Sequence, residues 1–373
     1  MIINFKLLAL VLLTCLAQTT LSFGQKSRFT DILYTGTYST RGSKGIYVLQ
    51  FDRKQGKLTE LQTVSGGSNP SFVAVNPNGK NVYSINENQN GAVMSFQVNA
   101  SSGLLTKLNE QASPGGPAHI SVDPKGRFVY VSNYGGGTLS IYPLKKDGSL
   151  GVASGIIRHD GSGPNAQRQK EPHTHSAVPS LNGKFVYVSD LGIDKIMIYQ
   201  VKDGTLTPAE SPYFKSTPGS GPRHFALHPS GKFAFSAEEL TSTITSLRVD
   251  KSTGALTQME RVSMLPEGFT ATSSAADIHV SPDGKFVYAS NRGHDSLVIY
   301  AIDPATGKLT FVGHESTGGK VPRGFMMDSK GEYILAGNQN TDNIVVFKRD
   351  RSTGKLTRMG EQKVPAPVCI QQL

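Results

Sequence analysis

A short hydrophobic pattern repeats along the chain: a turn glycine, a run of aromatic and β-branched residues, then a small residue and a polar one. Six clear copies recur about every 50 residues. They begin at Gly79, Gly126, Gly183, Gly231, Gly284 and Gly331 and include GKNVYSIN, GRFVYVSN and GKFVYASN. A degenerate first copy, DILYTGT, covers Asp31 to Thr37. Repeats of this length are typical of a solenoid, a propeller or an array.

Other strand-like segments surround each copy. A segment that opens on a small residue or a proline precedes the glycine, as in GPRHFAL from Gly221 to Leu227, and a third run follows, as in SLVIYAI from Ser296 to Ile302. A TGKLT-type turn then leads to a weaker fourth run, such as Leu309 to Glu315. No apolar pattern of helical period and length interrupts them. Four short strands per period predict the blades of an all-β propeller.

Only six of the seven copies have their own opening strand before them. The seventh opening strand is supplied by APVCIQQ, from Ala366 to Gln372, in which Pro367 stands where Pro117 and Pro222 stand in other copies. The sequence therefore predicts one seven-bladed β-propeller over residues 29–373, closed by the C-terminal strand joining the N-terminal blade. Such closure removes a sheet edge that would otherwise pair with another chain.

Residues 1–24 have the pattern of a signal peptide. Lys6 precedes an apolar stretch from Leu7 to Ala17, and small residues follow near position 24. We expect export, periplasmic or secreted, without a transmembrane anchor after processing, because the apolar run is shorter than the ~20 residues that span a bilayer. A lipid anchor at Cys15 is the less favoured alternative, since Cys15 lies inside the apolar stretch.

The charge and cysteine content limit the possible partners. The formal net charge is +10, but the lysines are spread over turns and form no basic block, so no nucleic-acid partner is expected. After removal of the signal segment only Cys369 of the 2 cysteines would remain. The exported domain would then have no internal disulfide, and Cys369 is expected to be a buried thiol.

Propeller geometry indicates where the chemistry lies. The start of each inner strand and the end of each second strand lie at the same end of the central channel, which we call the funnel. Candidate residues for it are the strand endings Asp190, Glu238 and Asn291, the opening-strand residues His119, His173, His175, Arg223, His224 and Arg323, and Arg292 beside an ending. Three arginines near one funnel favour an anion site, because guanidinium groups bind carboxylate or phosphate and stabilise an oxyanion.

One insertion breaks the period between the third and fourth copies. The additional residues fall in the segment 159–175, and a loop this long is more often functional than decorative. Arg168 and Gln169 are its expected substrate contacts. His173 and His175 are two apart on a strand and point to one side. The pair could ligate a metal, transfer protons or simply pack, although no third ligand has suitable spacing.

Four motifs together resemble the lactonase family of seven-bladed propellers, which contains the propeller-type 6-phosphogluconolactonases and the fungal carboxymuconate lactonising enzymes. The motifs are GSGPNAQRQKEPHTHS from Gly161, VYVSDLGIDKIMIY from Val186, GPRHFALHPSGKF from Gly221 and ASNRGHDSL from Ala289. The resemblance implies a site in the channel mouth made of one His, two Arg and one Glu, with no metal and no cofactor. The matching positions in this sequence are His173, Arg223, Glu238 and Arg292.

The chemistry that the resemblance implies is hydrolysis of a small anionic or sugar lactone. Glu238 or His173 would take a proton from water, while Arg223 and Arg292 would hold the developing oxyanion or an anionic group of the substrate. The remaining candidates are expected to position the substrate: His119, Arg168, Gln169, His175, Asp190, His224, Asn291 and Arg323.

The expected export of the protein conflicts with a phosphorylated sugar lactone as its substrate. A phosphorylated sugar lactone belongs to cytoplasmic carbohydrate metabolism, whereas a signal peptide favours an unphosphorylated aldonolactone. Two other functions stay open at this point. One is an exported propeller that binds without catalysis, since fold does not fix function; the other is a muconate-lactonising cyclase that uses the same groups in reverse. The sequence leaves the oligomeric state open.

Overall fold

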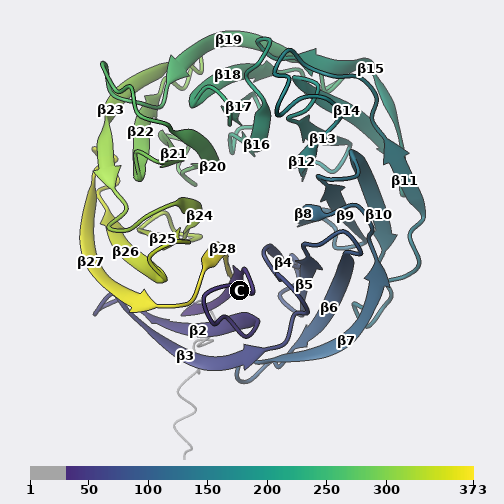
Figure 1. Cartoon of the computed structure of the whole chain (residues 1–373), viewed down its shortest axis with the longest axis vertical. Coiled ribbons are helices and arrows are strands. Elements are labelled where there is room, and N and C mark those ends of the chain that lie inside the picture. Colours follow the sequence, from purple (N-terminus) through teal and green to yellow (C-terminus); the bar gives the residue numbers. More distant parts are fainter. Residues whose placement is uncertain (1–30) are drawn as a thin grey trace, which may run out of the picture.

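The computed structural model describes residues 31–373; the expected signal peptide at 1–24 lies outside the described residues. Seven four-stranded antiparallel sheets are arranged as blades around a central axis (Figure 1). The prediction of an all-β, seven-bladed propeller is confirmed. Over the described range, no helix is long and apolar enough to cross a membrane.

Within each blade the strands follow one another from the channel outward (Figure 1). Blade 1 contains β28 (Pro367–Gln372), β1 (Ile32–Thr37), β2 (Ile46–Asp52) and β3 (Lys57–Val64). Blade 2 contains β4 (Val73–Val75), β5 (Asn81–Asn86), β6 (Ala92–Val98) and β7 (Leu105–Ala112). Blade 3 contains β8 (Pro117–Val122), β9 (Phe128–Asn133), β10 (Thr138–Pro143) and β11 (Gly155–Arg158). Blade 4 contains β12 (Thr174–Pro179), β13 (Phe185–Asp190), β14 (Lys195–Lys202) and β15 (Thr205–Lys215).

The last three blades follow the same plan. Blade 5 contains β16 (Pro222–Leu227), β17 (Phe233–Glu238), β18 (Thr243–Val249) and β19 (Leu256–Ser263). Blade 6 contains β20 (Ser274–Val280), β21 (Phe286–Arg292), β22 (Ser296–Ile302) and β23 (Leu309–Ser316). Blade 7 contains β24 (Pro322–Met327), β25 (Tyr333–Asn338), β26 (Asn343–Arg349) and β27 (Leu356–Lys363).

The ring closes where the C-terminal strand meets the N-terminal one. β28 pairs antiparallel with β1, with Cys369 opposite Gly36 and Ile370 opposite Thr35. The predicted closure is therefore confirmed. Cys369 is buried there, and burial raises the pKa of its thiol to about 12.

Tyrosines of the repeat fasten neighbouring blades together. In three copies the buried tyrosine hydroxyl donates to a glycine carbonyl in the β-turn between the two outer strands of the next blade. The pairs are Tyr34 with Gly103 at 2.8 Å, Tyr83 with Gly148 at 3.0 Å and Tyr288 with Gly354 at 2.7 Å. The repeated tyrosine therefore has a polar partner in a site that is otherwise apolar.

Apolar clusters fill the spaces between adjacent blades. Phe235 and Ile244 of blade 5, for example, pack in one buried cluster with Val287 and Val298 of blade 6. Each fully buried side chain of this size stabilises the fold by ~1.5–3 kcal/mol relative to an exposed one. This packing makes a rigid ring on which the residues around the channel are held.

Candidate active site

A β-bulge near the start of each of several inner strands aims a side chain into the funnel. The register shifts between Pro117 and His119, Thr174 and Ser176, Pro222 and His224, and Pro322 and Gly324. The extra residues are Ala118, His175, Arg223 and Arg323. A bulge leaves its extra residue outside the ladder and redirects its side chain. Consistent with this, Ala118, Arg223 and Arg323 line one small cavity, together with residues that include Ser71 and Val368.

Three arginines surround the carboxylate of Glu239. Arg223 Nε lies 2.9 Å from Oε2, Arg292 Nη2 lies 2.9 Å from Oε2, and Arg168 Nη2 lies 2.6 Å from Oε1. We call these four residues the arginine cluster. Arg168 comes from the long insertion, Arg223 from β16 and Arg292 from β21, so the cluster joins the loop between blades 3 and 4 to blades 5 and 6.

Two of these guanidinium groups are also fixed by backbone. Arg223 Nη1 donates to the carbonyl of Ala276 at 2.6 Å, and Arg292 Nη2 donates to the carbonyl of Ala275 at 2.8 Å. Both carbonyls belong to residues near the start of β20. Arg292 Nε is buried and has no hydrogen-bond partner among the described residues. The Nε–H group of Arg292 is therefore a donor without an acceptor among these residues, held in place at the edge of the arginine cluster.

The electrostatics of the arginine cluster are strongly perturbed. Burial alone would raise the pKa of Glu239, but the charges of Arg292 and Arg223 and the hydrogen bond from Arg168 outweigh it and hold that pKa far below its usual range. Burial, together with the charges of Arg292 and Arg323, lowers the pKa of Arg223 to about 9. Glu239 is thus a weak base, and its role here is to hold the arginines rather than to take a proton.

A second carboxylate lies on the other side of the small cavity. Glu87 accepts hydrogen bonds from the hydroxyls of Tyr38, at 3.1 Å, and of Ser71. The guanidinium of Arg323 lies over the ring of Tyr38, 5.2 Å from its centroid, in a cation–π contact. The funnel therefore contains four arginines and two carboxylates, an excess of positive charge suited to an anionic ligand.

His173 stands beside the arginine cluster and is held in one orientation. Its ring stacks on Tyr134, with 4.4 Å between centroids and 8° between planes, and its Nδ1 lies 3.0 Å from the carbonyl oxygen of Tyr134. Because a carbonyl can only accept, Nδ1 carries the proton and a neutral ring has an unprotonated Nε2. The hydroxyl of Tyr134 in turn accepts from Arg168 at 3.2 Å.

The polar ending of the fifth copy does not reach the funnel. Glu238 is fully buried within blade 5, where it accepts from Thr243, Thr245 and Arg261 at 2.9, 2.8 and 2.8 Å. The expectation that Glu238 lies with the arginines is wrong: the position belongs to Glu239. The physical reason is that successive side chains along a strand point to opposite faces of the sheet. Glu238, the last residue of β17, lies on the face that holds Thr243, Thr245 and Arg261, and the next residue, Glu239, points away from them toward the funnel arginines.

The same correction applies to two other strand endings. Asp190 accepts from the backbone N–H of His173 at 2.7 Å and pairs with His159 Nδ1 at 2.6 Å, so it supports the histidine from behind. Asn291 donates to the carbonyl of Met264 at 2.7 Å and is fully buried. Neither side chain lies in the funnel; both fasten the loops that surround it.

Of the two loop residues predicted as contacts, only one reaches the cluster. Arg168 does so through Glu239. Gln169 is buried and donates from Nε2 to the carbonyl of Leu191, at 2.8 Å, and to Asp194 Oδ1, at 2.7 Å. Gln169 therefore holds the insertion against blade 4 and presents nothing to the funnel.

The remaining predicted histidines, which include the bulge residue His175, form a collar around the channel. The ring of His224 lies 5.6 Å from His119 and 5.3 Å from His175, and Phe72 lies 4.5 Å from His119. The structure thus brings these three histidines together in the channel. Within residues 31–373, no group of three or more His, Cys, Asp or Glu side chains is arranged to hold a metal ion.

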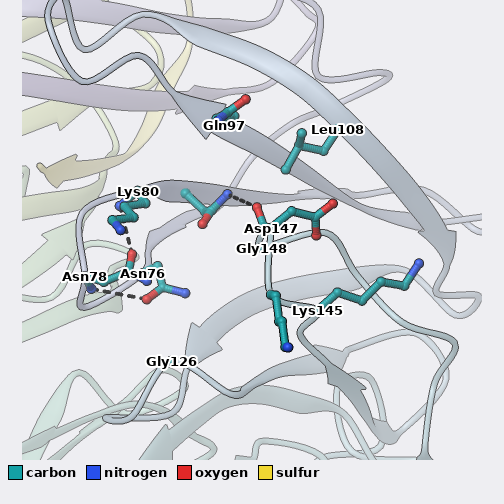
Figure 2. Close-up of a pocket in the computed structure, with 11 residues that line it drawn as sticks. Asn76, Asn78, Lys80, Gln97, Leu108, Gly126, Lys145, Asp147 and Gly148 are labelled. Carbon is teal, nitrogen blue, oxygen red and sulfur yellow. Dashed lines mark hydrogen bonds between the residues drawn. The ribbon is translucent and has the colours of Figure 1, made fainter.

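A separate hollow lies between blades 2 and 3, and Figure 2 shows the side chains around it. Its walls include the turns that follow β4 and β8, so it lies on the face opposite the funnel. It has a volume of about 410 Å³, and its walls include Lys80 and Lys145. Two of its asparagines are already engaged: Asn76 Oδ1 accepts from the backbone of Asn78 within a local turn, and Asn81 Nδ2 donates across the blade junction to the carbonyl of Asp147. It contains none of the residues predicted from the sequence.

Comparison with known proteins identifies the family. Residues 32–372 match the family model described as lactonase, 7-bladed beta-propeller. The chain belongs to this family. It is 40% identical over 297 residues to 6-phosphogluconolactonase of Bacillus subtilis, covering 79% of this chain and 84% of that protein. It is 35% identical over 307 residues to a protein of the same name from Formosa agariphila, covering 79% and 86%.

A similar solved structure carries a related name. The periplasmic gluconolactonase of Pseudomonas aeruginosa superposes with a TM-score of 0.87 at 31% identity, over 91% of this chain and 98% of that one. The recognition made from the four sequence motifs is therefore confirmed at the level of the family.

Sequence reasoning missed several residues of the funnel. Tyr38, Glu87, Tyr134 and Glu239 each follow directly after the polar ending of a repeat copy, as Arg292 does. Because Arg292 was expected in the funnel, the same offset applied to the other copies points to all four. That offset is the signal that could have identified them.

Proposed function

We propose that the protein hydrolyses sugar-acid lactones, as a 6-phosphogluconolactonase or as a hydrolase of a related aldonolactone. The observation that carries the proposal is the arginine cluster: the buried carboxylate of Glu239 holds Arg223, Arg292 and Arg168 in fixed positions. Arg168 also donates to Tyr134, on whose ring His173 stacks. An ester carbonyl that becomes negatively charged in the transition state needs such preorganised donors. The names of the relatives from Bacillus subtilis and Formosa agariphila support the same chemistry.

In the proposed reaction, His173 Nε2 takes a proton from water, and the water oxygen bonds to the lactone carbonyl carbon. Arg223 and Arg292 stabilise the oxyanion that forms on the carbonyl oxygen. The bond between the carbonyl carbon and the ring oxygen then breaks, and the ring oxygen receives the proton that His173 holds. The product is an open-chain hydroxy acid. Glu239 does not react; it aligns the two arginines and Arg168.

Either a phosphate or a sugar hydroxyl array could occupy the outer part of the funnel. The excess of arginine over carboxylate favours an anionic substituent, which Arg323 and Arg168 would bind. We also propose that residues 1–24 direct export. That location favours an unphosphorylated lactone, and the name of the Pseudomonas aeruginosa relative supports such a substrate.

A direct assay tests the proposal. Purified protein is mixed with fresh 6-phosphoglucono-1,5-lactone or glucono-1,5-lactone, and acid release is followed in a pH-stat against buffer alone. We expect acceleration of at least one lactone, lost in Arg223→Gln and His173→Gln. Arg127→Gln changes an arginine on the opposite face that pairs with Asp123 and serves as the matched control. If neither lactone is opened faster than in buffer, the proposed function is wrong.

A further inference from the structure

The central channel has a second hollow at the mouth opposite the funnel. This lower hollow has a volume of about 450 Å³ and is lined by the ends of inner strands, including Val75, Val122 and Leu227. Phe72 and His224 line both the lower hollow and the small cavity beside the arginines. His224 therefore stands at the partition between the funnel and the opposite face of the molecule.

Asp277 holds His224 in this position. Its Oδ1 accepts from His224 Nδ1 at 2.7 Å and from the backbone of Ile278 at 2.9 Å; its Oδ2 accepts from the backbone of Phe325 and from His279 Nε2, both at 3.1 Å. Burial alone would raise the pKa of Asp277, but the charge of His279 and the hydrogen bond from His224 keep it well below the usual value. Asp277 is therefore an ionised carboxylate, and each of its two oxygens accepts two hydrogen bonds.

The carboxylate fixes the proton on His224. Because it can only accept, Nδ1 of His224 carries the proton and Nε2 has a free lone pair. That Nε2 is buried and has no hydrogen-bond partner in the part of the chain that the structure describes. Burial and the charge of Arg223 lower the pKa of His224 to about 4, against the opposing effect of Asp277, so the ring is a neutral acceptor near pH 7.

The other groups that face His224 leave this acceptor available. Burial lowers the pKa of His119 and of His175 well below the usual value, so both collar rings are neutral. His279 lies on the far side of Asp277; burial would lower its pKa, but the charge of Asp277 raises it. Among the ionisable side chains against the ring, Arg223 is therefore the cation on the funnel side and Asp277 the anion on the other.

We infer that His224, held in place by Asp277, relays a proton from the floor of the funnel to the lower hollow. The inference rests on the proposed hydrolysis. One proton of the attacking water goes through His173 to the ring oxygen, and the other remains on the new carboxylic acid. In the relay that O–H bond breaks, its electron pair stays on the carboxylate beside the arginines, and the proton bonds to His224 Nε2. The imidazolium then releases this proton from Nε2 to water that enters from the lower hollow, which His224 also lines, while Nδ1 keeps its own proton and its hydrogen bond to Asp277.

The energetics suit this transfer. The arginines that hold the pKa of Glu239 far below its usual range make a product acid beside them a stronger acid as well, so its proton moves readily to the neutral ring of His224. Asp277 stabilises the imidazolium that forms on His224, while the positive charge of Arg223 favours rapid release of its proton. A substrate that fills the funnel blocks the shorter way to solvent, and the opposite mouth is then the open one. Asp277 acts through His224 and is a positioning residue.

Steady-state kinetics of three variants test the relay. His224→Gln and Asp277→Asn are expected to lower kcat at least tenfold with KM within twofold of wild type. In His224→Ala, added imidazole is expected to restore part of the lost rate, because the lower hollow gives it access. His314→Gln, in the outer strand of blade 6, is the matched control. A wild-type kcat in folded His224→Gln overturns the relay, and so does a loss in His224→Ala that imidazole leaves unchanged.

A second measurement does not depend on lactone hydrolysis. In ¹⁵N NMR of histidine-labelled protein, assigned with His224→Gln, His224 is expected to have Nδ1 protonated and Nε2 unprotonated at pH 7. A protonated Nε2 at pH 7 overturns the relay whether or not the protein opens a lactone. If the NMR result is as expected and wild-type protein opens no lactone, the proposed function fails and the relay, which has no proton to carry, fails with it.

Discussion

Arg168 and Glu239 form an ion pair with 2.6 Å between Nη2 and Oε1, although 71 residues separate them in the chain. Arg168 is supplied by the insertion that breaks the repeat period, and Glu239 follows the second strand of blade 5. The pair ties the insertion to the arginine cluster. The insertion therefore belongs to the site, and Gln169, which anchors it to blade 4, belongs to its support.

Arg168→Ala should weaken substrate binding more than it weakens the fold. The arginine side chain is 41% exposed, so its ion pair contributes only ~0–1 kcal/mol to stability. A charged hydrogen bond to substrate is worth ~1.5–3 kcal/mol, so we expect KM to rise about tenfold or more while the melting temperature stays nearly constant. Lys170→Ala, exposed on the same loop, is the control. An unchanged KM in Arg168→Ala would show that this residue does not contact the substrate.

The adjacent acids Glu238 and Glu239 should behave differently when each is changed to glutamine. Glu239→Gln removes the charge that aligns Arg223 and Arg292 and should reduce kcat/KM by at least a hundredfold. Glu238→Gln weakens the bond to Arg261 inside blade 5 and should lower the melting temperature while kcat/KM stays within about threefold. Thermal unfolding and lactone kinetics on both variants check this. The reverse pattern would return the catalytic assignment to Glu238.

Acid should remove the stability that Glu239 contributes. Its folded pKa lies far below the ordinary glutamate value of ~4.3, so the contribution is complete above that value and is lost as the pH falls toward the folded pKa. We expect the difference in melting temperature between wild type and Glu239→Gln to be constant from pH 7 to about 5 and to shrink below it. A difference that stays constant down to pH 3 would contradict the burial of this charge among the arginines.

Tyr288→Phe should destabilise the junction of blades 6 and 7 without affecting the site. The hydroxyl donates to the carbonyl of Gly354 at 2.7 Å and accepts from Arg349 Nε at 2.9 Å. Leaving buried partners unsatisfied costs ~1–3 kcal/mol, so urea unfolding should show a loss of that size. Tyr213→Phe, on an exposed ring, is the control. Activity is expected to be unchanged in both variants.

The repeat was sufficient to predict the fold because each copy contains the same residues that form the turn and the buried strand. A turn glycine such as Gly79, with φ of 69°, and a buried tyrosine such as Tyr83 recur in register, and only the number of copies and the closing strand had to be found. The funnel arginines could be predicted because a charged residue at an otherwise apolar strand start is conspicuous. Arg223 and Arg323 were found in this way.

The site carboxylates could not be assigned as easily. Two acids in succession leave a one-residue ambiguity, and a one-residue shift on a strand reverses the direction of the side chain. Glu87 and Tyr38 are 49 residues apart and meet only because blades 1 and 2 are neighbours in the ring. Asp277 was missed because its partners come from β16 and β24, which no local pattern connects.

The bulges of the inner strands separate the chemistry of the funnel from the stability of the sheets. A bulge residue takes no part in the ladder, so its identity is free to vary while the strand register stays fixed. In this chain the position holds alanine in blade 3, histidine in blade 4 and arginine in blades 5 and 7. The propeller thus has equivalent bulge positions around one opening. Substitution at a single bulge position can change the ligand specificity of the funnel while the strand pairing of the blades stays the same.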